Sequence, residues 1–159
     1  MELLLKLLKE NARASVEDLA KELNLTPAAV KKKIATLETD RVILGYQAIL
    51  DPTKVNNASV TAVIEVKITP ERGGGFDRLA SRIAKFEQVQ SCYLMSGGYD
   101  LMVIVQGSNL QEVASFISEK LSTIKGVVAT ATHFRLKAYK ENGTMLTQEE
   151  RTQRLAVAP

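Results

Sequence analysis

The chain has 159 residues, of which 45% are hydrophobic and 25% are charged, and its net charge is +3. This length suits one or two domains with ordinary cores, and the charge is too small to predict nucleic-acid binding by itself. The single cysteine, Cys92, excludes an internal disulfide framework and is typical of a reducing compartment. No apolar run is long enough to span a membrane, and the start MELLLKLLKE has no cleavage site of a signal peptide, so we expect a cytoplasmic protein.

The first fifty residues predict three short helices. The first has an apolar stripe at helical spacing, formed by Leu4, Leu5, Leu8 and Ala12. The second begins at Ser15, because Asp18 three residues later completes a capping box, and Asn24 suits the left-handed position after its end. The third begins with Thr26 as its N-cap and Pro27 as its first helical residue, and it extends to residue 39.

Two short helices joined by a tight turn, the second of them basic outside, are typical of a helix-turn-helix. Small outward residues let a helix backbone approach base edges, and three lysines without an intervening acid can neutralise phosphates. The candidate contacts to double-stranded DNA are Thr26, Ala28, Ala29, Lys31, Lys32, Lys33 and Thr36. The alternative is a three-helix bundle whose lysines form a solvated face. Residues 41–50 are predicted to be extended with a turn at Gly45, as a wing or a linking strand.

Residues 51–59 are polar and rich in turn formers, so they form a natural linker between a domain at 1–50 and a second at 60–140, with a polar tail at 141–159. The second domain is predicted to contain strand 60–68, helix 76–86, strands 89–96 and 99–107, helix 109–126 and strand 127–139. The order β-α-β-β-α-β predicts a ferredoxin-like plait and an α+β fold for the whole chain.

The third predicted strand of the plait is apolar on both faces, because Val103, Ile104 and Val105 follow one another. Helices cover only one face of such a sheet. We therefore expect a second copy of the sheet to cover the other face, in a homodimer.

The stretch LMSGGYDLMVIV, residues 94–105, places two glycines and an aspartate before this strand. Gly97 and Gly98 expose backbone N–H groups to which a carboxylate can bind, and Asp100 attracts an ammonium group, so the pair suits a zwitterion. A simple turn in which Asp100 hydrogen-bonds its own loop explains the same residues. On the last predicted strand, Thr130 and Thr132 add hydroxyl groups.

The motifs NARASVEDLAKELNLT, VKKKIATLE, VILGYQAILD, SGGYDLMVIV and GVVATATHF match those of a known family. Over nearly its whole length the chain resembles the Lrp/AsnC family, the feast/famine transcriptional regulators. The resemblance implies sequence-specific binding of DNA by dimers, which often assemble to octamers. It also implies an effector, an amino acid or related metabolite, bound between plait domains. The implied effector residues are Ser96, Gly97, Gly98, Tyr99, Asp100, Thr130 and Thr132.

Two features depart from the family pattern. The lead-in before the first helix is short, and Arg41 stands where the family often has glycine after the recognition helix. A left-handed backbone there costs a non-glycine residue about 1 kcal/mol. We expect Arg41 to recover that cost by contacting a DNA phosphate.

Other chemistry is weakly supported. The segment RGGGFD lacks the lysine and hydroxyl of a P-loop, and one cysteine with one histidine, Cys92 and His133, gives neither a catalytic pair nor a metal site. We expect no metal, no cofactor and no enzymatic activity. The alternative is a plait-fold metabolic sensor or small enzyme whose N-terminal helices dock protein rather than DNA.

Overall fold

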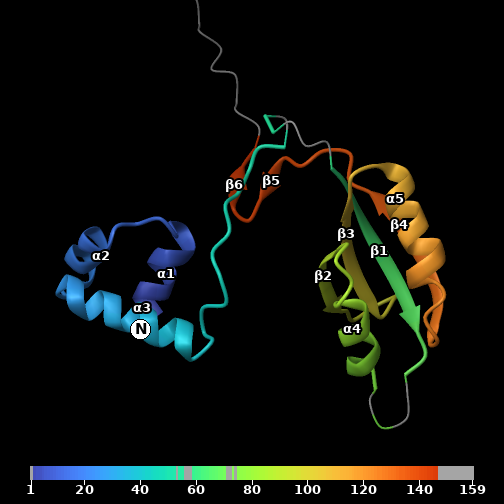
Figure 1. The fold of residues 1–159 in the computed structure, drawn as a ribbon, viewed down its shortest axis with the longest axis horizontal. Helices are drawn as coiled ribbons and strands as arrows, with labels where there is room; N and C mark the ends of the chain where they lie inside the picture. The colour runs from blue at the N-terminus through green and yellow to red at the C-terminus, as the bar shows by residue number, and fades with distance from the viewer. Residues whose placement is uncertain (1, 53, 56–58, 71–72, 74, 147–159) are drawn as a thin grey trace, which may run out of the picture. The chain divides into compact units, whose positions relative to one another are not determined.

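The computed structural model describes residues 2–52, 54–55, 59–70, 73 and 75–146. The chain divides into two compact units, one ending at Ile49 and the other beginning at Leu50 (Figure 1). The predicted linker 51–59 lies partly outside the described residues, as does the tail beyond residue 146. In the part of the chain that is described, no helix has the length and apolar character needed to cross a membrane.

The N-terminal unit consists of α1 (Glu2–Glu10), α2 (Val16–Leu23) and α3 (Pro27–Thr39). Its buried core contains two apolar side chains from each of the three helices: Leu4, Leu8, Leu19, Ala20, Val30 and Leu37. The first helix is shorter than predicted and does not reach Ala12. It ends because the Asn11 side chain accepts a hydrogen bond from the Arg13 N–H at 3.0 Å, which favours a turn over a further helical residue.

The turn between α2 and α3 forms as the sequence predicts. Ser15 Oγ accepts from the Asp18 N–H at 3.0 Å and donates to the Asp18 carboxylate at 2.6 Å, which makes the start of α2. Asn24 has a left-handed backbone with a φ of 53°, and Thr26 Oγ1 accepts from the Ala29 N–H at 3.2 Å. These caps fix where each helix ends and therefore how α3 leaves the turn.

The expected wing or linking strand is wrong. Residues 43–50 are neither helix nor strand. An extended segment needs neighbouring strands for its backbone groups, and instead the N–H groups of Val42 and Ile43 both donate to the carbonyl of Leu37, at 2.9 and 3.0 Å. These bonds bind the beginning of the segment to the end of α3.

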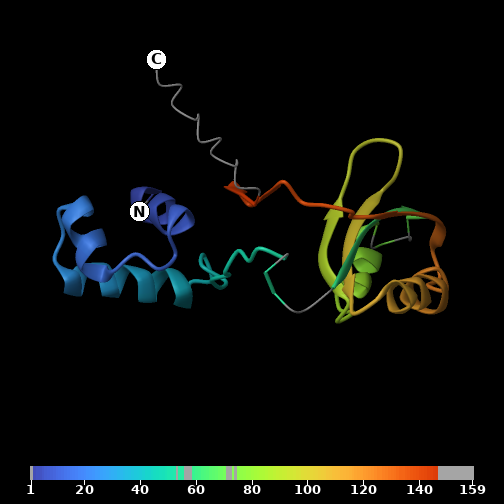
Figure 2. The ribbon, with the colours of Figure 1, turned by 90° about the horizontal axis from the view of Figure 1, so that it is seen from above.

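The C-terminal unit has the predicted β-α-β-β-α-β order. Its elements are β1 (Val60–Ile68), α4 (Asp77–Ile83), β2 (Val89–Leu94), β3 (Leu101–Gly107), α5 (Leu110–Ser115), a π-helical segment η1 (Phe116–Leu121) and β4 (Val127–Phe134). The four strands form one antiparallel sheet in the order β2-β3-β1-β4. Both α4 and α5 lie on the same side of this sheet (Figure 2).

Alternate residues of the central strands form the core beneath these helices. Ile64 pairs with Val103, and Val66 pairs with Leu101, and all four are fully buried. Leu79 and Ile83 of α4, together with Val113 of α5 and Phe116, Leu121 and Ile124 after it, complete the core. The residues that alternate with these along the same strands, such as Val63 and Ile104, point to the opposite face of the sheet, which neither helix covers.

Several boundaries differ from the prediction. Helix α4 ends at Ile83 rather than at residue 86, β2 ends at Leu94 rather than at residue 96, and β3 begins at Leu101 rather than at residue 99. The last helix changes after Ser115 into the π-helical segment η1, and β4 ends at Phe134 rather than at residue 139. A small hairpin of β5 (Lys140–Glu141) and β6 (Thr144–Met145) occupies the start of the predicted tail. Its turn is Asn142-Gly143, both with positive φ, which suits a two-residue hairpin loop.

Candidate DNA-recognition helix and effector loop

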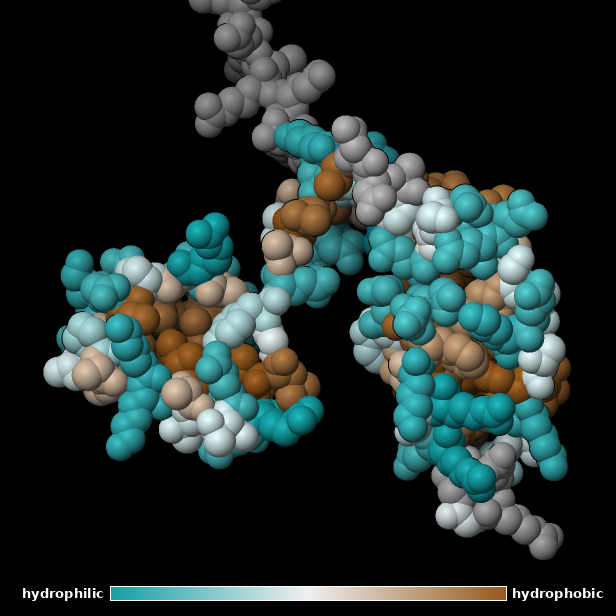
Figure 3. Space-filling view, viewed as in Figure 1, coloured by the Kyte–Doolittle hydropathy of each residue, from teal (hydrophilic) through white to brown (hydrophobic). Residues whose placement is uncertain are grey.

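The outward face of α3 presents small side chains and lysines. Val30 and Leu37 are buried against α1 and α2, so the opposite side of the helix faces solvent. Ala29 is half-buried, and the predicted contact residues Ala28, Lys31, Lys32, Lys33 and Thr36 are exposed. The surface along α3 is accordingly a mixture of hydrophilic and pale side chains (Figure 3).

The three lysines of α3 are available for an external anion. Within the described ranges, no carboxylate forms an ion pair with Lys31, Lys32 or Lys33. A cationic helix face without internal partners can neutralise phosphates of a nucleic acid.

Two threonines on the same face direct their hydroxyl protons into the helix. Thr36 donates to the carbonyl of Lys32 at 2.9 Å, and Thr39 donates to the carbonyl of Ala35 at 2.8 Å. Thr26 uses its oxygen as the N-cap acceptor, so its O–H remains able to donate to a phosphate. The candidate contacts of α3 therefore differ in the hydrogen-bonding groups that they present.

Arg41 adopts the left-handed conformation that the missing glycine would favour, with a φ of 56°. It follows the C-terminus of α3 and is exposed. Sequence reasoning missed a second feature here, a hydrogen bond of 3.0 Å from the Tyr46 hydroxyl to Glu38 Oε1. Partial burial and this carboxylate raise the pKa of the Tyr46 phenol. No periodic pattern predicts this contact, because Tyr46 lies outside regular structure and Glu38 lies near the end of α3.

The effector loop, residues 96–99, connects β2 and β3. The Met95 N–H donates to the Asp100 carbonyl at 2.8 Å and closes the loop, and Gly97 has a φ of 136° that favours glycine. A Cβ atom at Gly97 or Gly98 would meet no heavy atom within 4 Å. The two glycines are therefore exposed and have open space on the side where a side chain would stand.

Asp100 binds the neighbouring strand β1 rather than its own loop. Its Oδ2 accepts from the Ile68 N–H at 2.8 Å, and its own N–H donates to the Val66 carbonyl at 3.0 Å. The alternative in which the Asp100 side chain hydrogen-bonds its own loop is therefore wrong, because its partner is Ile68. The carboxylate extends the β3–β1 ladder, and its second oxygen carries no hydrogen bond from another described residue.

The structure brings only some of the predicted effector residues together. Thr130 lies opposite Val66, and Val66 lies opposite Leu101, so Thr130 and Leu101 lie two strands apart, about 10 Å. Thr132 lies opposite Ile64, farther from the loop. Both threonines are half-buried on the face that the helices cover. Ser96 is exposed and Tyr99 is half-buried in the loop. One chain alone therefore does not enclose a pocket with these seven residues.

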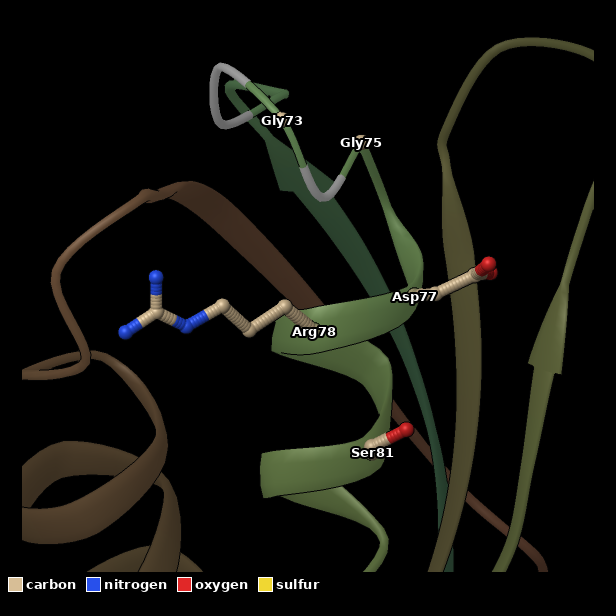
Figure 4. A pocket seen from close by; sticks show the side chains of 5 residues that line it. All are labelled: Gly73, Gly75, Asp77, Arg78 and Ser81. Carbon is tan, nitrogen blue, oxygen red and sulfur yellow. The ribbon is translucent and has the colours of Figure 1, made fainter.

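A hollow beside α4 of the plait lies away from these residues. It measures about 620 Å³ and is lined by Gly73, Gly75, Asp77, Arg78 and Ser81. The Arg78 side chain points away from Asp77 and Ser81, so the polar groups do not converge on one ligand position (Figure 4). The surface over α4 is strongly hydrophilic in Figure 3, and it contains none of the predicted effector residues.

Cys92 and His133 are far from forming a reactive pair. Burial raises the pKa of the Cys92 thiol, whose sulfur lies 3.9 Å from the Ala80 carbonyl on the helix side of the sheet. His133 lies on the other face, with its Nε2 3.4 Å from Glu65 Oε1. Among the described residues, no group of three His, Cys, Asp or Glu side chains could hold a metal ion.

Both units of the chain match known protein families. Residues 2–38 match the AsnC-type helix-turn-helix domain, and residues 61–145 match the Lrp/AsnC ligand binding domain. The chain is 46% identical over 157 residues to the HTH-type transcriptional regulator YugG of Bacillus subtilis, covering 98% of this chain and 95% of that protein. It is 29% identical over 134 residues to a proline dehydrogenase transcriptional activator of Rhodobacter capsulatus, covering 84% and 86%.

A solved transcriptional regulator of Neisseria meningitidis in complex with L-methionine has the same fold. It is 25% identical, with a TM-score of 0.69 over 87% of this chain and 88% of that chain. A helix-turn-helix unit followed by a ligand-binding plait defines a class of transcriptional regulator. This chain belongs to the Lrp/AsnC family of that class.

The left-handed Arg41 gives a prediction in which stability and DNA binding change in opposite directions. Arg41→Gly relieves the backbone strain and should raise the free energy of unfolding by up to about 1 kcal/mol. The same variant loses a cation, and its DNA affinity should fall with a salt slope smaller by about one unit. Urea unfolding and fluorescence anisotropy at several salt concentrations measure the two effects.

Arg41→Ala is the matched control, because it removes the cation and keeps a strained non-glycine backbone. It should bind DNA as weakly as Arg41→Gly without the gain in stability. Equal stabilities for the glycine and alanine variants would contradict the strain, and unchanged DNA affinity in both would remove Arg41 from the interface.

Proposed function

We propose that this regulator binds operator DNA with α3 lying in the major groove, and that the phosphate contacts come from Thr26, Lys31, Lys33 and Arg41. The observation that carries the proposal is the exposed basic face of α3, opposite its buried residues Val30 and Leu37. The small side chains of Ala28 and Ala29 at the start of the helix permit a close approach to base edges. The function places the protein in the cytoplasm with its DNA.

The proposed regulator acts as a homodimer formed through the uncovered face of the sheet. Tyr93, Val63, Met102 and Ile104 lie on this face, and none of them belongs to the core beneath the helices. A second copy of the face would bury them in both chains through a two-fold contact. Two α3 helices in one particle would then recognise a pseudo-palindromic operator, and further assembly to an octamer would bring several operators together.

The proposed effector is an amino acid bound between C-terminal units of different chains. The Neisseria meningitidis neighbour was solved with L-methionine, and a relative regulates proline dehydrogenase, so a free amino acid is the chemical class that best fits. In this chain, Gly97 and Gly98 would offer N–H groups to the carboxylate, and Asp100 its second oxygen to the ammonium group. A neighbouring chain would supply Thr130 and Thr132, because one chain does not enclose the site.

The DNA interface predicts a specific effect of salt. Replacing both Lys31 and Lys33 with alanine should weaken binding to every duplex alike, because phosphate contacts carry no sequence information. The plot of log affinity against log salt should flatten by about two units, one for each phosphate lost. Anisotropy titrations of a fluorescent operator between low and physiological salt measure the slope.

The matched control is Lys6→Ala with Lys9→Ala, since both lysines are exposed on α1 and lie outside the predicted interface. This control should keep the wild-type slope. A wild-type slope in the α3 variant would contradict the placement of that helix on DNA.

The effector site predicts that Gly98→Leu blocks ligand binding without unfolding the chain. Gly98 has open space around it and, unlike Gly97, has no positive φ that a side chain would strain. Calorimetry with each of the twenty amino acids should find one or a few that bind wild type and fail to bind Gly98→Leu. The oligomeric state is measured in parallel, because a ligand between chains should alter assembly.

Gly45→Leu is the matched control, because Gly45 is equally open and lies outside the plait. Equal binding to wild type and Gly98→Leu would place the effector site elsewhere. Failure of all twenty amino acids to bind wild type would contradict the proposed ligand class.

A further inference from the structure

Lys32 lies at the centre of the side of α3 that faces away from the core. Residues advance by about 100° each around a helix, so the buried side marked by Val30, Ile34 and Leu37 lies almost directly opposite Lys32. Lys31 and Lys33 lie about 100° to either side of it. When the helix lies in a major groove, the central residue points at base edges and the flanking residues point at the two phosphate backbones.

The side chains around Lys32 on this face offer methyl groups and no free hydrogen-bond donor. Ala28 and Ala35 are exposed and have only methyl groups. Thr36 and Thr39 donate their hydroxyl protons to carbonyls of their own helix, at 2.9 and 2.8 Å, so they have no proton to donate to a base. Glu38, the one acidic residue of α3, accepts the hydrogen bond from Tyr46. Lys32 is therefore the hydrogen-bond donor at the centre of the face.

We propose that Lys32 determines sequence specificity by binding a guanine in each half-site, and that Thr36 contacts the methyl group of a neighbouring thymine. An ammonium group only donates, and guanine presents two adjacent acceptors, O6 and N7, in the major groove. Adenine places an amino donor beside its N7, which opposes a second donor. This inference rests on the proposed binding of DNA by α3 and assigns different roles to its three lysines.

The roles separate in a selection experiment. The full chain is used to select duplexes from a library of random sequence, with wild type, Lys32→Ala and Lys31→Ala in parallel. Wild type should select a guanine at one position of each half-site, with about tenfold discrimination against the other bases. In Lys32→Ala this discrimination should disappear at that position and persist at the others. Lys31→Ala should bind all selected duplexes more weakly and keep the wild-type motif.

Two substitutions of Thr36 test the methyl contact. Thr36→Val keeps a methyl group and removes the hydroxyl, so it should keep the thymine preference. Thr36→Ser keeps the hydroxyl and removes the methyl, so it should lose the preference. Replacing the contacted thymine with deoxyuridine should lower the affinity of wild type and leave that of Thr36→Ser unchanged. Circular dichroism confirms that each variant is folded.

The contradicting results are distinct. If Lys32→Ala keeps the full wild-type motif and binds all duplexes more weakly, Lys32 contacts a phosphate and the inference is wrong. If Thr36→Val and Thr36→Ser behave alike, the methyl contact is wrong. If wild type retains no duplex from the library, the proposed binding of DNA fails, and this inference fails with it.

Discussion

The covering of only one face of a four-stranded sheet is the constraint on which the C-terminal unit depends. Strand β1 directs Ile64 and Val66 into a core under α4 and α5, where both are fully buried, and directs Val63 and Glu65 to the other side. Because neither α4 nor α5 packs on that side, the apolar residues that the two central strands direct there are not buried by a second layer. The composition of β3, apolar on both faces, has no explanation within a single chain and has a simple one in a pair of chains.

A contact between chains on the side of the helices, in addition to the proposed pairing, would explain why the effector residues are spread over the sheet. Within one chain the loop 96–99 precedes the start of β3, and Thr130 and Thr132 lie on the edge strand β4, two strands away from β3. A ligand that joins such groups from different chains would bind one assembly better than another. Its effect on DNA affinity would then be matched by an equal effect of DNA on ligand affinity.

Local signals in the sequence predicted most of the fold. The caps at Ser15 and Thr26 and the left-handed Asn24 fix the helix-turn-helix because each satisfies backbone groups within a few residues. The alternation of β1 and the order of elements predicted the plait in the same way. The Asn142-Gly143 turn is an equally local signal for the β5–β6 hairpin, although the segment as a whole is polar.

Features that depend on distant residues could not be predicted. The contact of Asp100 joins residues 32 positions apart, and no spacing rule distinguishes it from an Asp that binds its own loop. The expected wing failed because residues 43–50 have strand-like composition but no neighbouring strand. The π-helical geometry that begins at Phe116 has no local sequence signal. Phe116 is buried and meets Phe86 edge-on with ring centroids 5.4 Å apart.

The most direct test of this account is the assembly of the full chain with a charge placed on the uncovered face. Sedimentation at micromolar concentration should show wild type as a dimer or larger, and Ile104→Glu as a monomer with unchanged circular dichroism. Leu110→Glu should remain assembled, since Leu110 is 57% exposed at the start of α5, on the side of the helices. A monomeric wild type, or an Ile104→Glu variant that assembles as wild type does, would contradict the account.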